Sequence, residues 1–88
     1  MRTFFIYTED KNRSQIEAML SEQFDGFTLL FGQGFWRGLR EVYRENSLIV
    51  VLLTNDARKV KGVAEEIKKL NNQESVLVAS WKTEMEMI

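Results

Sequence analysis

The feature that most constrains the fold is an unbroken run of six apolar residues, Leu48 to Leu53. The run contains the β-branched residues Ile49, Val50 and Val51, and polar residues bound it on both sides. A short apolar run of this composition is typical of a strand that is buried on both faces. We therefore expect it to form the central strand of a sheet.

Strand and helix patterns alternate along the rest of the chain. The helix patterns follow clusters of N-cap candidates, Asp10 or Asn12 for the first and residues 54–56 for the second. Their apolar residues have the spacing of one helix face. The predicted strands cover residues 3–8, 27–31, 48–53 and 75–81, and the helical stripes are Ile16, Met19 and Leu20, then Val60, Val63, Ala64, Ile67 and Leu70. Residues 83–88 also alternate, as a short fifth strand at an edge of the sheet would.

The order of these elements is strand, helix, strand, strand, helix, strand. With two right-handed crossovers it predicts an α+β, ferredoxin-like βαββαβ sandwich, in which two helices cover one face of an antiparallel sheet. The alternative is a pair of separate hairpins with loosely attached helices, which would bury much less surface. At 88 residues we expect one domain, covering residues 1–88.

Residues 35–46, which join the second and third strands, are too many for a tight hairpin. They form either a projecting loop or a pair of frayed strand ends. Gly32 and Gly34 interrupt the preceding strand near its end, as at a bulge or a close backbone approach. The segment carries Trp36 and Tyr43 together with Arg37, Arg40 and Arg44. It is either a solvated hairpin tip or a loop that binds an anion or a partner.

The predicted topology brings four polar segments to one end of the sheet: residues 7–10, 34–37, 44–47 and 72–75. The N-terminus of the first helix, with its spare backbone N–H groups, points to the same place. This suits a small-anion pocket, although the same residues would serve equally as caps that tie loops together. The predicted ligand-binding residues are Gly34, Trp36, Arg37, Arg40, Arg44, Glu45, Ser47, Gln73 and Ser75.

Apolar residues lie on both faces of the predicted sheet, although the helices can cover only one. Phe5 and Tyr7 oppose Phe4 and Ile6 by alternation alone. A second apolar face in a small domain is normally covered by another subunit or a ligand. We therefore expect a homo-oligomer, most simply a dimer with sheets packed face to face.

The composition excludes several kinds of function. The 12 Lys and Arg against 13 Asp and Glu give a net charge of −1, which argues against general nucleic-acid binding. With no histidine and no cysteine, the chain lacks the usual neutral-pH base, thiol nucleophile and commonest metal ligands. No apolar segment approaches membrane-spanning length and the first residues do not read as a signal peptide, so we expect a cytoplasmic protein.

Two short blocks carry a resemblance to a known family. Arg44-Glu45-Asn46-Ser47 and Gln73-Glu74-Ser75-Val76-Leu77, with the weaker blocks Gly34-Phe35-Trp36-Arg37 and Asp25-Gly26-Phe27-Thr28-Leu29, resemble a family of small bacterial and phage proteins known only as a domain of unknown function. The resemblance covers about residues 25–80. It supports the strand placement and the polar edge, and it implies no activity.

These observations predict a non-enzymatic binding or interaction protein that uses no cofactor, metal or catalytic residue. It would bind a protein partner or a small anionic, nucleotide-like ligand through the polar edge and the arginine-bearing segment. A phage-type protein that interferes with a host system fits this description by analogy. The alternative is a metal-dependent hydrolase or nuclease that uses carboxylates such as Glu45 and Glu74.

Overall fold

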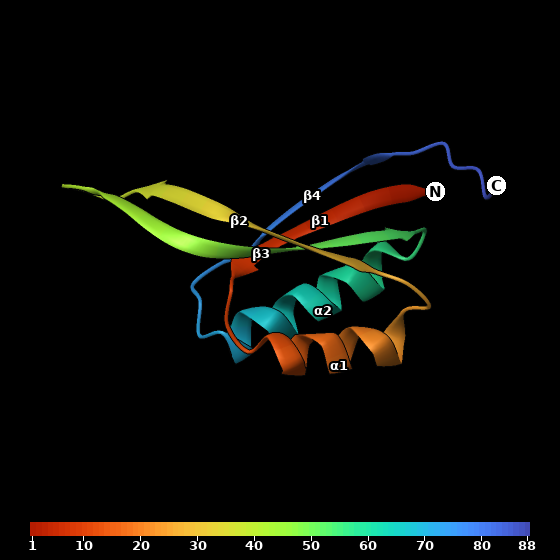
Figure 1. The fold of residues 1–88 in the computed structure, drawn as a ribbon, viewed down its shortest axis with the longest axis horizontal. Helices are drawn as coiled ribbons and strands as arrows, with labels where there is room; N and C mark the ends of the chain where they lie inside the picture. Colours follow the sequence, from red (N-terminus) through yellow and green to blue (C-terminus); the bar gives the residue numbers. More distant parts are fainter.

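The apolar run lies inside the longest strand of a four-stranded antiparallel sheet, whose strand order is β2-β3-β1-β4. The computed structural model describes residues 1–88, and both helices lie on one side of the sheet (Figure 1). The elements are β1 (Arg2–Glu9), α1 (Arg13–Gln23), β2 (Thr28–Arg37), β3 (Val42–Thr54), α2 (Ala57–Leu70) and β4 (Leu77–Lys82). The predicted ferredoxin-like βαββαβ sandwich is therefore confirmed.

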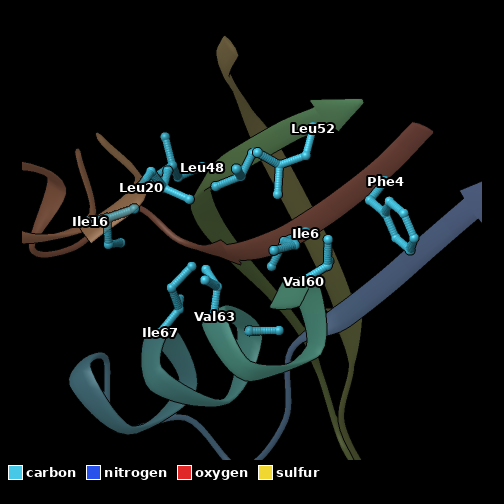
Figure 2. Close-up of a cluster of buried hydrophobic side chains, with 11 residues drawn as sticks. Phe4, Ile6, Ile16, Leu20, Leu48, Leu52, Val60, Val63 and Ile67 are labelled. Carbon is cyan, nitrogen blue, oxygen red and sulfur yellow. The ribbon is translucent and has the colours of Figure 1, made fainter. Parts of the chain in front are cut away.

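One core lies between the sheet and the helices. The apolar run, predicted to be buried on both faces, is buried only on its helix side, where Leu48, Val50 and Leu52 are at most 1% exposed. Leu53, on the other face, is 46% exposed because no helix covers that side. The predicted stripes of both helices face the buried side (Figure 2). Burial of these side chains supplies most of the driving force for folding. The buried apolar residues are Phe4, Ile6, Ile16, Leu20, Leu48, Val50, Leu52, Val60, Val63, Ala64 and Ile67. Neither helix is long and apolar enough to cross a membrane.

The two helices begin in different ways. Asp56 caps α2 in the usual manner, since its Oδ1 accepts a hydrogen bond from the backbone N–H of Lys59 at 3.0 Å. Asn12 occupies the cap position of α1 in a left-handed conformation, φ 55°, and its side chain makes no cap hydrogen bond. Asp10 is no cap either. It pairs with Arg13 at 2.7 Å, and this hydrogen bond raises the pKa of the guanidinium, which stays charged throughout the working range of pH.

The hairpin joining β2 and β3 departs from the sequence prediction. The sequence predicts a second strand over residues 27–31 and either a projecting loop or frayed strand ends over residues 35–46, whereas the ladder continues regularly to the pair Arg37 and Val42. Gly32 and Gly34 lie inside it, opposite Ser47 and Glu45, and form no bulge. The backbone hydrogen bonds of a paired ladder outweigh the weak strand preference of glycine. The hairpin consequently projects beyond the helices (Figure 1).

The last strand and the tail also differ from the prediction. The fourth strand covers Leu77–Lys82, not 75–81, and residues 83–88 form no fifth strand. The backbone N–H of Thr83 donates to the carbonyl of Met1, which is the last contact of this kind along β1. Residues 83–88 pair with no strand in the sheet, so alternation alone does not make a strand.

Candidate functional site

The sheet face opposite the helices is apolar and open. Strand register places residues from all four strands on it: Phe5, Tyr7, Leu30, Ile49, Val51, Leu53, Leu77, Ala79 and Trp81. Leu77 and Trp81 are 54% and 47% exposed, although the ring centroid of Trp81 lies 5.1 Å from that of Phe5. The second apolar face expected from the sequence is therefore present, and neither helix covers it.

A pocket of about 670 Å³ opens at the end of this face. Side chains of Tyr7 and Glu9 on β1 meet Trp36 and Glu45 of the hairpin there, beside the segment that leads from α2 to β4. Its lining residues are Tyr7, Glu9, Trp36, Glu45, Asn72, Gln73, Glu74, Ser75, Val76 and Leu77. All four polar segments predicted to converge contribute to it, so the topological argument is confirmed for the position of the pocket.

The hairpin wall of the pocket is held by one tryptophan. The indole Nε1–H of Trp36 donates to Oε1 of Glu45 at 2.9 Å. A Cβ atom at Gly34 would lie only 2.7 Å from Ser47 Oγ and 3.0 Å from Trp36 Nε1. Gly34 therefore contributes empty space, which lets the indole lie across the strand to reach the carboxylate.

The opposite wall depends on Asn71, a residue to which the sequence analysis assigns no role in the site. Asn71 is 1% exposed, and its Nδ2 donates to Thr8 Oγ1 at 2.9 Å and to the carbonyl of Glu9 at 3.1 Å. Its Oδ1 accepts from Asn12 Nδ2 at 3.0 Å. The Thr8 hydroxyl donates in turn to Oε1 of Gln73. Asn71 thus joins the end of β1, the start of α1 and the end of α2.

This network also defines the place of Gln73, one of the predicted ligand-binding residues. Its Oε1 accepts from the Thr8 hydroxyl and from the backbone N–H of Glu9 at 3.2 Å. Gln73 therefore holds the pocket wall to β1 while lining the cavity. The side chain of Ser47, also predicted, is buried behind Gly34, whereas Ser75 lines the rim.

The three predicted arginines lie apart from the pocket. Because side chains alternate across a strand, Arg37 and Arg44 project on the face opposite Trp36 and Glu45. Arg40 lies in the turn between the two strands. None of the three lines the pocket or forms a salt bridge. Within one copy, the structure does not bring the arginines and the polar edge together.

The charge of the pocket is acidic. Glu9, Glu45 and Glu74 line it together with two aromatic rings, and no lysine or arginine does. Lys11 lies next to it, with its Nζ 3.2 Å from the Glu9 carboxylate. Carboxylates accept hydrogen bonds, and flat rings offer stacking surfaces. The chain has no group of three acidic side chains arranged to hold a metal ion. The pocket therefore combines hydrogen-bond acceptors with aromatic surfaces.

No protein-family model and no curated protein matches the chain. Several solved structures are similar. A phage SAM lyase in complex with S-methyl-5'-thioadenosine has a TM-score of 0.73 at 16% identity, over 92% of this chain and 80% of the lyase chain. The periplasmic divalent cation tolerance protein CutA from Archaeoglobus fulgidus has a TM-score of 0.74 at 14% identity, over 99% of this chain and 88% of the CutA chain. The B. subtilis GlnK–ATP complex has a TM-score of 0.66 at 14% identity, over 91% of this chain and 78% of the GlnK chain. At these identities the likeness establishes the fold that this chain shares with the lyase, CutA and GlnK.

Proposed function

We propose that this chain is a non-enzymatic, homo-oligomeric binding protein that takes a nucleotide-like ligand in the polar pocket. One observation carries the proposal: the pocket opens on the apolar sheet face, not on the side covered by the helices. Tyr7 and Leu77 belong both to that face and to the pocket lining. A second copy that covers the face would therefore also border the pocket.

The open face supports the oligomer. Monomeric proteins rarely expose a large contiguous apolar patch, and such patches usually mark an interface. The hairpin adds to the argument, since Phe35, Trp36, Val42 and Tyr43 are each between 48% and 62% exposed. These side chains lie on both faces of a projecting ladder that no other part of the same copy covers. A neighbouring copy supplies the missing cover.

The lining of the pocket supports a nucleoside-like group as the ligand. Tyr7 and Trp36 would stack on a base, while Glu9, Glu45 and Glu74 would accept hydrogen bonds from its amino group and from the ribose. Two of the similar structures hold compounds of this class, S-methyl-5'-thioadenosine in the phage lyase and ATP in GlnK. Arg37 and Arg40, carried on the projecting hairpin of the next copy, would meet the phosphates of a nucleotide.

A thermal-shift series with S-methyl-5'-thioadenosine, AMP and ATP tests the ligand. We expect at least one of them to raise the melting temperature of the wild-type protein, because a ligand that binds only the folded state stabilises it. Trp36→Ala should abolish the shift, whereas Arg58→Ala, a change on the outer surface of α2, should keep it. Absence of a shift with all three compounds would leave a protein partner as the occupant, as in a phage-type protein that acts on a host system.

A second candidate function is catalysis on the same class of ligand. One similar structure is an enzyme, and the pocket places Oε2 of Glu45 beside an aromatic wall, free of the hydrogen bond that occupies Oε1. Incubation with S-adenosylmethionine, followed by chromatography of the products, separates the two functions. Turnover that is lost in Glu45→Gln would favour the enzyme, and unchanged ligand would favour binding alone.

A further inference from the structure

We propose that residues 83–88 of one copy dock in the groove between α2 and β4 of a second copy. The groove has a volume of about 410 Å³ and lies on the helix side of the sheet, and it shares only Ser75 and Val76 with the lining of the polar pocket. It is lined by Phe4, Ala57, Val60, Lys61, Ala64, Glu65, Lys68, Ser75, Val76 and Val78. This surface differs from the open sheet face, so the contact is additional to the assembly proposed above.

The groove is an apolar gap in the helical layer. β4 is an edge strand, and Val78 on its helix side remains 39% exposed because α2 does not reach across it. The rim carries two lysines, Lys61 and Lys68, and one carboxylate, Glu65. An occupant should therefore offer apolar side chains to the floor and negative charge to the two ammonium groups.

Residues 83–88, Thr-Glu-Met-Glu-Met-Ile, have this chemistry. Met85 and Met87 are 47% and 87% exposed, so both leave apolar surface uncovered in a single copy. Methionine fits irregular apolar surfaces well because its side chain is unbranched and flexible. Glu84 and Glu86 alternate with the methionines and would lie toward the rim, where Lys61 and Lys68 outnumber Glu65. The edge of β4 also has free backbone groups that an extended segment can pair with.

The tail is directed away from the groove of its own copy. Thr83 is held along β1 by the carbonyl of Met1 and by the hydroxyl of Thr3, and the segment continues outward (Figure 1). To fold back into the groove of its own copy, the tail would need a turn of about two residues. Since Thr83 is held in place, this turn leaves about three residues, which span about 10 Å of extended chain. Val76 lies six residues back along the chain from Lys82, about 20 Å away in extended chain. A second copy reaches the whole groove without this reversal.

Cross-linking between two differently tagged chains tests the docking directly. The chain has no cysteine, so single introduced thiols report one contact each. We expect Lys61→Cys in one chain and Met87→Cys in the other to form a disulfide-linked heterodimer under mild oxidation. The matched control replaces Lys61→Cys by Arg58→Cys, which lies on the same helix outside the groove, and it should give much less. Equal yields from the two pairs would overturn the proposal.

Charge reversal in the same cross-linking assay gives a second test of the docking. Adding Lys61→Glu and Lys68→Glu to the Arg58→Cys control chain should leave its low heterodimer yield unchanged. Adding Lys68→Glu to the Lys61→Cys chain should lower its heterodimer yield several-fold, and Glu86→Lys in the partner chain should restore it. Failure of the restoration would count against the docking. The mass of a variant without residues 83–88, measured in parallel, shows separately whether the open sheet face assembles.

Discussion

Alanine substitutions at Gly34 and Gly32 should have effects of opposite sign on stability. A Cβ at position 34 would lie 2.7 Å from the buried Ser47 Oγ, 3.0 Å from the Trp36 indole and 3.4 Å from Glu45 Cγ, so at least one of these groups must move. A Cβ at position 32 meets nothing within 4 Å, and no glycine in the chain has positive φ. The two positions lie on one strand and one face, which makes them a matched pair.

The change in the free energy of unfolding caused by Gly34→Ala combines three contributions. Displacing Trp36 from Glu45 loses a hydrogen bond, at a cost of about 0.5–1.5 kcal/mol. Forcing a side chain off its rotamer costs about 0.5–1.5 kcal/mol more. Alanine recovers about 0.4–1 kcal/mol by restricting the unfolded chain. Gly34→Ala should therefore destabilise the fold by about 1 kcal/mol. Gly32→Ala should stabilise it by about 0.5 kcal/mol, because only the restriction of the unfolded chain acts at this position.

Urea denaturation of both variants at one protein concentration measures this difference. It should separate the two midpoints by about 1 M, because urea lowers the free energy of unfolding by about 1–3 kcal/mol per molar for small proteins. In a Trp81→Phe background, the fluorescence of Trp36 should change with Gly34→Ala and stay unchanged with Gly32→Ala. Equal effects of the two substitutions would refute the close packing of Trp36 over Gly34.

Three further changes test the core, the network and the hairpin. Ile67→Ala should lower the free energy of unfolding by about 2–5 kcal/mol, because this side chain is fully buried among the core residues; a near-zero change in denaturant midpoint would mean that the helix stripe is misassigned. Asn71→Ala should cost about 2–3 kcal/mol by removing three side-chain hydrogen bonds, and calorimetry that finds less than about 0.5 kcal/mol would argue against its connecting role. Arg37→Ala with Arg40→Ala should leave the melting temperature nearly unchanged while weakening ATP binding, and unfolding of this double variant would show that the arginines are structural.

The parts of the fold that the sequence predicts correctly are those set by periodicity. The stripe from Val60 to Ile67 buries the side expected, because helix geometry fixes which residues share a face. The run from Leu48 to Leu53 forms the expected strand, but it is buried on one face and not on both, since Leu53 is 46% exposed. The position of the polar pocket also followed, since the order of elements determines which strand ends meet. Local backbone geometry and topology were sufficient for these conclusions.

The hairpin and the network were not predicted because they depend on partners distant in sequence. Within β2 alone, Gly32 and Gly34 indicate an interruption of the strand, but pairing with β3 keeps the strand continuous through both residues. Asn71 reads as a helix stop, yet its side chain turns inward to meet Thr8, 63 residues away. No local pattern contains that contact.

The separation of Trp36 from Arg37 follows from strand alternation. Adjacent residues in a continuous strand project to opposite faces, so a single copy cannot place both side chains in one pocket. The prediction of a joint site treated the segment as a loop, in which neighbours are free to converge. Once the strand is continuous, a joint site requires the hairpin of another copy, which is why the proposed site depends on assembly.

The most direct test of the account is native mass spectrometry of the wild-type protein and of two surface variants. The wild type should give a multiple of 10.3 kDa. Leu77→Glu, on the open sheet face of a chain without the proposed tail contact of residues 83–88, should give the single-chain mass, because a carboxylate buried in an apolar interface is strongly unfavourable. Phe31→Glu is the control, since Phe31 is 57% exposed on the helix side, where it lies under Arg13. The account predicts that this variant keeps the wild-type mass. A wild-type protein that is monomeric at micromolar concentration, or an oligomer that survives Leu77→Glu in the chain without residues 83–88, would contradict it.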